Sequence, residues 1–510
     1  MAPFMVGHVD VPMRDSPRPQ GPPATPKTVE LPAGHRRRSD CRALPSPIIL
    51  DQDQVLTLRD GTKIRADIYR PKTEGKVPAI LMWGPYGKSG SGPLNINVMP
   101  MRAGIPAEKL SGYEDFEGLD PAEWVPKGYA IVNADPRGVA IAPFEGASDV
   151  FREQSNRGGI PYTIFGDMIA NALVGRGQQE DIVAVTRSTT AFTEYHEDKR
   201  ADFSKVQVPA YIVASYSNEL HVVGTMRAFE EIPHKNKWLS VHSTHEWYDL
   251  YTKERTDELA KFYDYYLKGV QNDWLQTPPA RLPFFSFTKP PTFKAFSDLP
   301  WHEESAVKRQ LHLTTEGKLS VEPPSQSGSI AYAASTDEKV AFTYTFPSKT
   351  TITGPTTVVI DISSPEHTDL DVYTHLFKAD KGGNVVNHLN IPTLIQGLTP
   401  EKAQQFTTNA FARYWVPMDS CLSGRTWKTL SHAKVQPVNP GEIVQLEIQL
   451  WPTGLQFDAG EQLILKISGE KIGLATLPNL VKEANPNKGK HVLHLGGKHG
   501  SCLEYFTLDL

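Results

Sequence analysis

The stretch Tyr129-Ala-Ile-Val-Asn-Ala134 is a short, largely apolar run that ends at the turn Asp135-Pro-Arg-Gly138. An earlier stretch, Val77-Pro-Ala-Ile-Leu-Met-Trp83, has the same character and ends at a Gly-Pro turn. Short, continuous apolar runs between turn residues are typical of strands that are buried on both faces of a parallel sheet. The two stretches therefore predict strands of such a sheet.

The pattern continues on both sides of these runs. Upstream, residues 55–58 and the alternating residues 64–69 flank an Asp60-Gly61 bend, which predicts a β-hairpin. Downstream, residues 208–215 and 237–242 predict two more buried strands. Helices are predicted over residues 224–231 and 256–268, and the second ends at Gly269. Strands that alternate with helices predict an α/β domain over residues 46–284.

The two ends of the chain differ from this part in their composition and residue pattern. Residues 1–45 contain many prolines, the run Arg36-Arg37-Arg38 and few large apolar residues, which predicts a disordered tail. Beyond residue 284, several segments are rich in β-forming residues, largely alternate apolar with polar residues, and are separated by Pro, Gly and Asp turns. That alternation predicts an antiparallel β-sandwich over residues 285–510.

Composition excludes several classes of protein. The 53 Lys and Arg residues nearly balance 58 Asp and Glu residues, and the formal net charge of −5 argues against a general nucleic-acid binder. No apolar run approaches the roughly 20 residues that cross a bilayer, so no membrane association is expected. Cys41, Cys421 and Cys502 are odd in number and far apart, which argues against a disulfide framework. The start of the chain lacks a secretory-signal pattern, and we expect a soluble, cytoplasmic protein.

The order of several motifs identifies a family resemblance. Trp83-Gly-Pro-Tyr86-Gly-Lys88 comes first, then Asp135-Pro-Arg-Gly138, and then Thr353-Gly-Pro355 with Asp369-Leu-Asp371. In this order the motifs resemble those of the CocE/NonD family, the cocaine-esterase-like and X-Pro dipeptidyl-peptidase serine hydrolases. The resemblance covers most of residues 50–510. It implies an α/β-hydrolase core, a helical cap over residues 150–205 and a galactose-binding-like jelly roll as the C-terminal sandwich.

The resemblance also implies site residues. Tyr86 occupies the position of the family's oxyanion-stabilising tyrosine, and His245, in Val241-His-Ser-Thr-His245, occupies that of its general base, with His242 as the alternative. Asn218 stands where the family has the acid that orients this base. An amide oxygen can accept the imidazole N–H, but it supplies no charge to an imidazolium, and Glu219 is a substitute that stays open.

The family's nucleophilic serine has no clear counterpart. No G-x-S-x-G pattern lies on a strand-to-helix turn. Ser89 and Ser91 belong to a glycine-serine loop rather than an elbow, and the glycine spacing around Ser148 does not fit. The runs 129–134 and 139–143 both resemble strands of a parallel layer, but only four residues join them. Because parallel neighbours need a crossover of about a dozen residues or more, residues 138–141 look like the junction of a deletion that removed the elbow strand and its helix.

Three explanations of this deletion stay open: an inactive pseudoenzyme, an incomplete gene model, and a rearranged site that uses another serine. The expected activity is that of a serine hydrolase that cleaves an ester, or an amide after proline, through an acyl-enzyme. The alternative is an inactive protein with a binding or oligomerisation role. We expect a small ester or peptide as the substrate, no cofactor and no metal, and a homo-oligomer stays open.

Overall fold

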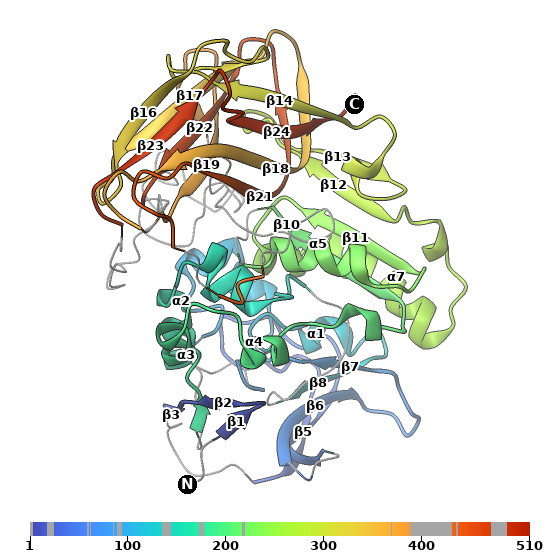
Figure 1. Cartoon of the computed structure of the whole chain (residues 1–510). Helices are drawn as coiled ribbons and strands as arrows, with labels where there is room; N and C mark the ends of the chain where they lie inside the picture. The colour runs from blue at the N-terminus through green and yellow to red at the C-terminus, as the bar shows by residue number, and fades with distance from the viewer. Residues whose placement is uncertain are drawn as a thin grey trace.

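A computed structural model describes most of the chain. The described residues are 4–17, 25–58, 61, 63–84, 86–88, 94–134, 144–172, 178–216, 220–368, 370–386, 388, 431–434, 437–470 and 487–510. Figure 1 shows a β-sandwich at one end of the molecule, a five-stranded sheet at the other end, and a smaller α/β layer between them. None of the helices in these ranges is long and apolar enough to span a membrane.

The five-stranded sheet has the strand order β4-β5-β6-β8-β7. Its strands are β4 (Lys27–Leu31), β5 (Ile48–Thr57), β6 (Lys63–Pro71), β7 (Ala79–Met82) and β8 (Ala130–Ala134). The predicted hairpin is confirmed, because β5 and β6 pair antiparallel on either side of Gly61. The predicted parallel strands are confirmed as well, because β7 and β8 pair in parallel with Ala79 beside Ala130.

The second sheet has the order β10-β11-β12-β13. Its strands are β10 (Ala210–Ser215), β11 (Lys237–His242), β12 (Ala280–Phe284) and β13 (Thr292–Phe296), and its helices are α5 (Val222–Glu231) and α7 (Lys253–Lys268). β10 and β11 pair in parallel, and every residue of β10 is buried, as its apolar sequence predicts. Helix α7 ends at Gly269, whose φ of +72° is a conformation that glycine adopts without a steric penalty.

Among the described residues, the two α/β sheets share no strand. Phe144 forms a single parallel bridge with Val213 of β10, and the Glu145 N–H donates to the Val213 carbonyl oxygen at 3.0 Å. One hydrophobic core nevertheless contacts both sheets, since it includes Ile131 of β8 and Tyr211 of β10. The proposed deletion junction at 138–141 lies outside the described residues, so the missing strand stays a prediction.

The N-terminal segment is partly ordered, and the prediction of a disordered tail over residues 1–45 is corrected for this part. β4 pairs with β5, and β3 (Met13–Asp15) pairs with β9 (Gln178–Glu180) in the stretch predicted as the cap. A hairpin of β1 (Phe4–Val6) and β2 (Val9–Val11) packs with the cap helices, and Val11, Val185 and Tyr195 form its core. These partners are distant in sequence, so the composition of the tail alone could not reveal them.

The described part of the cap stretch includes the short α-helices α2 (Ile164–Ala172), α3 (Ile182–Ser188) and α4 (Glu194–Asp198). They lie on one side of the β10–β11 layer (Figure 1). Two further helices flank the loops described below, α1 (Pro121–Trp124) and α6 (Glu246–Leu250).

The C-terminal region is an antiparallel β-sandwich, as predicted. One sheet has the order β15-β14-β24-β18-β23-β16, with β21 also paired to β18, and the other has the order β17-β22-β19-β20. The strands are β14 (Val307–Leu313), β15 (Leu319–Ser320), β16 (Gly328–Ala333), β17 (Lys339–Thr345), β18 (Thr350–Ser363), β19 (Tyr373–Ala379), β20 (Val385–Val386), β21 (Val444–Phe457), β22 (Gln462–Ser468), β23 (Lys490–Leu495) and β24 (Cys502–Thr507). β13 pairs antiparallel with β12 and so extends the α/β sheet beyond residue 285.

A buried lysine anchors the turn that follows β7. Lys88 Nζ lies 2.7 Å from Asp53 Oδ1 and 2.8 Å from Asp67 Oδ1, and all three side chains are largely buried. Asp53 sits at a bulge of β5 with a φ of +56°, and its N–H donates to Asp67 Oδ1 at 2.8 Å. Two carboxylates and one ammonium group therefore fix the turn that carries Tyr86 onto the β5–β6 hairpin.

Replacing Lys88 with methionine is expected to lower the free energy of unfolding by about 3 to 5 kcal/mol, because two buried carboxylates lose their cation. Urea unfolding followed by tryptophan fluorescence measures this loss. The matched control is Lys72→Met, which removes an exposed ion pair with Glu30 and should cost no more than about 1 kcal/mol. Equal losses in the two variants would contradict the anchoring role of Lys88.

Candidate active site

The two residues that the sequence predicts as oxyanion donor and general base follow the carboxyl ends of parallel strands. Tyr86 lies in the turn after β7, and His245 follows β11 as the residue that caps the start of α6. In open α/β sheets, ligands bind at the carboxyl ends of the strands. The fold therefore places both side chains where a substrate is expected.

A glutamate and a tryptophan connect Tyr86 to His245. The Tyr86 hydroxyl donates to Glu117, and Trp247 Nε1 donates to Glu117 Oε1 at 2.8 Å. The Phe116 ring contacts the Tyr86 ring, with centroids 4.8 Å apart, and also the Trp247 ring. The His245 ring lies on the Trp247 ring, with centroids 4.0 Å apart. The structure thus brings Tyr86 and His245 into one cluster. Glu117 also belongs to this cluster, although its place in the sequence did not indicate a site residue.

Glu117 has an unusual backbone and an unusual ionisation. Its φ of +64° places a non-glycine residue in the left-handed region, a strain of about 1 to 3 kcal/mol that tends to occur at functional sites. Burial, together with the neighbouring Glu246 charge, raises its pKa to about 7. Burial and the Glu117 charge raise the pKa of Tyr86 well above its ordinary value. Tyr86 therefore stays protonated, and its only proton points to Glu117 when that carboxylate is ionised.

His245 is positioned by its own helix. Its side chain is 8% exposed, and Nδ1 lies 2.7 Å from Glu246 Oε2, the first residue of α6. The C-terminal region also reaches this loop, because His388 Nε2 donates to the carbonyl oxygen of Ser243 at 2.8 Å. Asn218 and Glu219, the residues predicted at the acid position, lie outside the described residues.

His242, the alternative base, has a different environment. It is buried at the end of β11, with Nε2 2.9 Å from Glu145 Oε1 and Nδ1 2.9 Å from the Thr244 carbonyl oxygen. A carbonyl oxygen only accepts, so Nδ1 carries a proton, and Nε2 faces the Glu145 carboxylate. His221, which caps α5, lies on the other carboxylate oxygen of Glu145, at 3.9 Å. His242 is therefore a member of a buried ion cluster, and nothing in the sequence pattern indicated its partner Glu145.

The charges of this cluster reinforce one another. Burial opposes the ionisation of Glu145, but the nearby His221 and His242 side chains hold its pKa below the ordinary value. Burial also opposes the protonation of His242, yet the Asp249 charge and the bond to Glu145 raise its pKa. Glu145 has a φ of +53°, so this ion cluster lies on a second strained residue, next to the Phe144 bridge.

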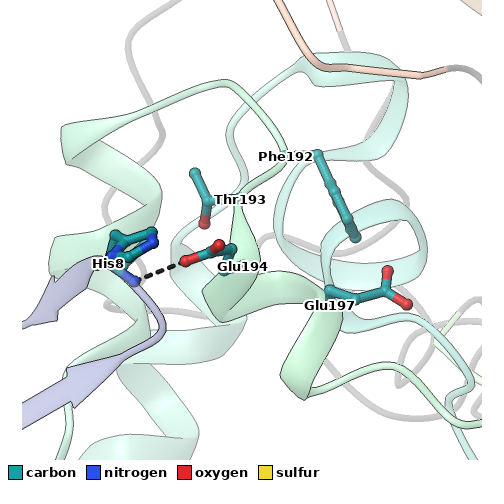
Figure 2. A pocket seen from close by; sticks show the side chains of 6 residues that line it. His8, Phe192, Thr193, Glu194 and Glu197 are labelled. Carbon is teal, nitrogen blue, oxygen red and sulfur yellow. Dashed lines mark hydrogen bonds between the residues drawn. The ribbon is translucent and has the colours of Figure 1, made fainter.

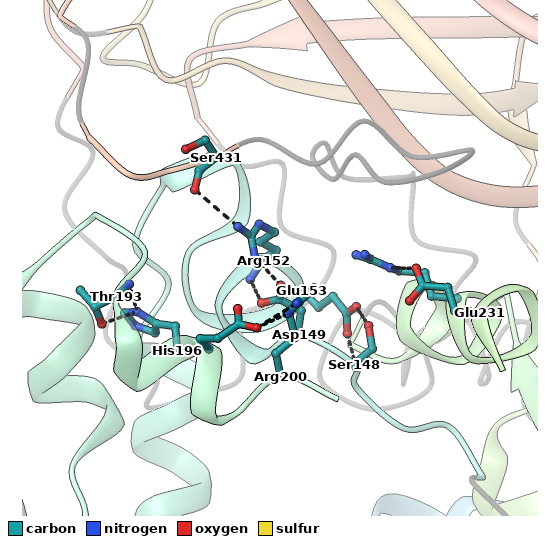
Figure 3. A network of polar contacts seen from close by, with 11 residues as sticks. Ser148, Asp149, Arg152, Glu153, Thr193, His196, Arg200, Glu231 and Ser431 are labelled. Carbon is teal, nitrogen blue, oxygen red and sulfur yellow. Dashed lines mark hydrogen bonds and ion pairs between the residues drawn. The ribbon is translucent and has the colours of Figure 1, made fainter. Parts of the chain in front are cut away.

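Ser148 does not serve His245 in this structure. Its hydroxyl donates to Glu153, and its N–H donates to Glu153 Oε2 at 2.7 Å (Figure 3). Ser89 and Ser91 lie outside the described residues. Within the part of the chain that the structure describes, the imidazole of His245 contacts Glu246 and Trp247 and forms no hydrogen bond with a hydroxyl group.

The same network fixes the entrance of the cap. Arg152 is buried in the helical turn Phe151–Ser155, and its Nη1 lies 2.6 Å from Asp149 Oδ2. Its Nη2 points to the carbonyl oxygen of Ser431 at 3.5 Å (Figure 3). Its guanidinium also covers the Phe192 ring. Arg152 thus joins the cap to a segment of the C-terminal region.

The described residues line a cavity beside this site and a shallow hollow elsewhere. A cavity of about 300 Å³ adjoins the site, because Phe116, which contacts Tyr86, lines its wall together with Asp115, Tyr251 and Asn95. A shallow hollow of about 500 Å³ lies between the N-terminal hairpin and α4, where the His8 N–H donates to Glu194 Oε2 at 2.6 Å (Figure 2). Only the first shares a residue with the Tyr86 cluster. Among the described residues, no group of three or more ligating side chains could hold a metal ion.

The Glu145 cluster predicts a defined pH dependence of stability. Its carboxylate contributes above the ordinary glutamate pKa of about 4.3 and loses this contribution as the pH falls through its lowered value. His242 contributes fully below about pH 6.5 and loses its contribution as the pH rises through its raised value. We expect the free energy of unfolding to decrease above about pH 6.5, and this decrease to be smaller in a His221→Gln, His242→Gln double variant. Urea unfolding across this range tests the prediction, and an unchanged pH dependence would contradict it.

Two family models match the chain. The X-Pro dipeptidyl-peptidase (S15 family) model matches residues 60–156, and the model of the X-Pro dipeptidyl-peptidase C-terminal non-catalytic domain matches residues 272–504. Together they cover more than half of the chain. No curated protein gives a significant match in sequence.

Several solved structures share the fold. A CocE/NonD family hydrolase from Staphylococcus aureus matches with a TM-score of 0.73 and 23% identity, over 91% of this chain and 94% of that chain. An aminopeptidase from the marine sediment archaeon Thaumarchaeota archaeon has a TM-score of 0.60 and 12% identity, over 90% and 97%. An α-amino acid ester hydrolase has a TM-score of 0.59 and 13% identity, over 90% and 96%.

These similarities confirm the predicted fold class, an α/β-hydrolase core followed by a β-sandwich. The two family matches and the shared architecture show that the chain belongs to the CocE/NonD, X-Pro dipeptidyl-peptidase-like family of hydrolases.

Proposed function

We propose that this protein is a serine hydrolase that cleaves a small ester, or an amide that follows proline, at the carboxyl ends of β7 and β11. One observation carries the proposal: Tyr86 and His245, which are far apart in sequence, meet through Glu117 and Trp247 at this edge of a family-matched fold. The S15 family match supports the post-proline amide. Of two structural neighbours, the aminopeptidase supports an amide substrate and the α-amino acid ester hydrolase supports an ester substrate.

In the proposed reaction, His245 acts first as the general base and then as the general acid. Its Nε2 accepts the proton of the attacking hydroxyl as the new bond to the carbonyl carbon forms, and the resulting imidazolium returns that proton to the leaving alcohol or amine. Water then attacks the acyl-enzyme by the same route, releases the acid and restores the hydroxyl. His245 thus ends the cycle in its starting protonation state.

The Tyr86 hydroxyl donates a hydrogen bond to the oxyanion that develops in each step. In the structure this proton points to Glu117, so donation to substrate requires the Tyr86 hydroxyl to leave that carboxylate. Because the pKa of Glu117 is about 7, the carboxyl group is partly protonated near neutral pH and then holds the hydroxyl less strongly. The substrate side chain is assigned to the adjoining cavity of about 300 Å³, which is at the small end of ligand sites.

A second function has one observation in its favour. The imidazole of His245 has no hydroxyl partner among the described residues, as expected of an inactive relative that retains the substrate-binding surface. In that case the protein binds the ester or peptide without turnover.

A fluorophosphonate probe separates the two functions, because it reacts with a serine that a histidine base activates. For the hydrolase we expect one labelled serine in the folded protein and no label in a His245→Ala variant. If folded protein takes up no label but still binds a proline-containing dipeptide or an aryl ester in calorimetry, the hydrolase is excluded and the binding function is supported.

If a serine is labelled, removing the hydroxyl of Tyr86 should slow turnover selectively. Tyr86→Phe is expected to lower kcat by about 10²- to 10³-fold, the usual effect of losing one oxyanion donor. Steady-state kinetics on an aryl ester measure this change. Tyr265→Phe on α7 and His8→Ala in the exposed hairpin are controls that should keep full activity, and an unchanged kcat in Tyr86→Phe would refute the oxyanion role.

A further inference from the structure

The Tyr86 hydroxyl has one proton but two acceptors for it. In the structure this hydroxyl donates to Glu117, whereas the proposed reaction requires the same proton at the oxyanion of the substrate. A phenol oxygen also accepts hydrogen bonds, so both contacts can exist together if Glu117 becomes the donor. An ionised carboxylate only accepts, but a protonated carboxyl group has an O–H. The protonation state of Glu117 therefore decides where the Tyr86 proton points.

The packing around Glu117 keeps its partners in place in both states. Trp247 Nε1–H donates to Glu117 Oε1 at 2.8 Å, and a protonated carboxyl group still has an oxygen that accepts this bond. The buried Phe116 ring packs on the Tyr86 ring, with centroids 4.8 Å apart, and on the Trp247 ring, with centroids 5.3 Å apart. Tyr86 and Glu117 themselves are only partly buried, as contact with a substrate requires.

Charged and polar groups on three elements act on the carboxyl group of Glu117. Burial favours its neutral form, and so does the charge of Glu246 on α6. The Trp247 N–H, the charge of His221 at the start of α5 and the Tyr86 hydroxyl favour the ionised form. Together they raise the pKa of Glu117 to about 7, so that both forms are present near neutral pH.

The two tyrosines beside this loop do not titrate with Glu117. Burial and the charges of Glu117, Glu246 and Asp115 raise the pKa of Tyr86 well above its ordinary value. Burial, together with the charges of nearby carboxylates, raises the pKa of Tyr251 in the same way. Tyr86 therefore remains a hydrogen-bond donor in both states of Glu117.

We propose that Glu117 in its protonated form is the positioning residue of the oxyanion hole: its carboxyl O–H donates to the Tyr86 oxygen and directs the Tyr86 proton to the substrate. The inference rests on the proposed hydrolase function. Each of the two O–H groups keeps its proton, so no covalent bond changes on either residue. Consecutive hydrogen bonds polarise one another, which makes the Tyr86 hydroxyl a stronger donor. The ionised form is the less active state, because it holds the Tyr86 proton and adds a negative charge beside the oxyanion.

The pH dependence of kcat in two Glu117 variants tests this role. Glu117→Gln copies the protonated form, since its amide supplies a donor and an acceptor but no charge. In the wild type, kcat should fall above about pH 7, by up to about tenfold per pH unit, as Glu117 ionises. Glu117→Gln should show no such fall and should exceed the wild-type kcat about tenfold or more at about pH 9. Glu117→Leu, which supplies no donor, should be slower than Glu117→Gln at every pH.

The control for these variants is Glu108→Gln, at an exposed position of the turn Ala107–Lys109, which should keep the wild-type profile. A purely structural role of Glu117 would not make its variant faster than the wild type at high pH. A Glu117→Gln variant that declines as the wild type does, or that is slower than the wild type throughout, would overturn the proposal.

A second measurement does not depend on turnover. In protein labelled with ¹⁵N-tryptophan, the indole N–H signal of Trp247, identified by its loss in Trp247→Phe, should shift with a midpoint at about pH 7. The shift should disappear in Glu117→Gln, and its midpoint should rise in Tyr86→Phe, because the ionised carboxylate loses a donor. A midpoint that Tyr86→Phe leaves unchanged would refute the contact, even in an active enzyme. If the expected shifts appear in a protein that takes up no fluorophosphonate, the contact is supported and the hydrolase function fails.

Discussion

The ion pair between His242 and Glu145 is the contact on which the arrangement of the core depends. It joins the end of β11 to the residue after Phe144, whose backbone bridges to β10, and it is buried from solvent. A buried carboxylate is tolerated only when cations and donors surround it, which His242 and His221 provide. The cluster thereby holds together the last parallel strands, the start of α5 and the chain that enters the cap. The loop that carries His245 begins at this cluster, directly after His242.

Two histidines three residues apart consequently have separate tasks. His242 is buried, donates from Nδ1 to the Thr244 carbonyl oxygen and faces Glu145 with Nε2, whereas His245 lies beside Glu246 and on the Trp247 ring. The difference arises from the end of β11: the strand directs His242 into the core, and the following turn carries His245 to the start of α6. A carboxylate lies beside each ring: Glu145 beside His242 and Glu246 beside His245.

The site also draws on parts of the chain that lie outside the α/β layer. Lys88 fixes the turn of Tyr86 to the β5–β6 hairpin, and His388 of the C-terminal region donates to the loop before His245. Arg152 links the cap to Ser431. The His388 contact gives the C-terminal region a direct part in positioning the loop before His245, even though its family model describes a non-catalytic domain. A change in the packing of the C-terminal region against the α/β region is therefore expected to alter the geometry of the site.

The sequence by itself determined the two-part architecture, the hairpin at Gly61, the parallel strands and the positions of Tyr86 and His245, because apolar periodicity and turn residues are local and the motifs keep their order along the chain. Only the tertiary structure decided which side chains surround these two residues. Glu117, Glu145 and Glu246 resemble ordinary acidic residues in the sequence, and the ordered N-terminal strands resemble a polar tail. The surroundings of Glu117 and Glu145 arise from contacts between segments far apart in the chain and from burial, which shift the pKa of both carboxylates, and neither effect can be read from local composition.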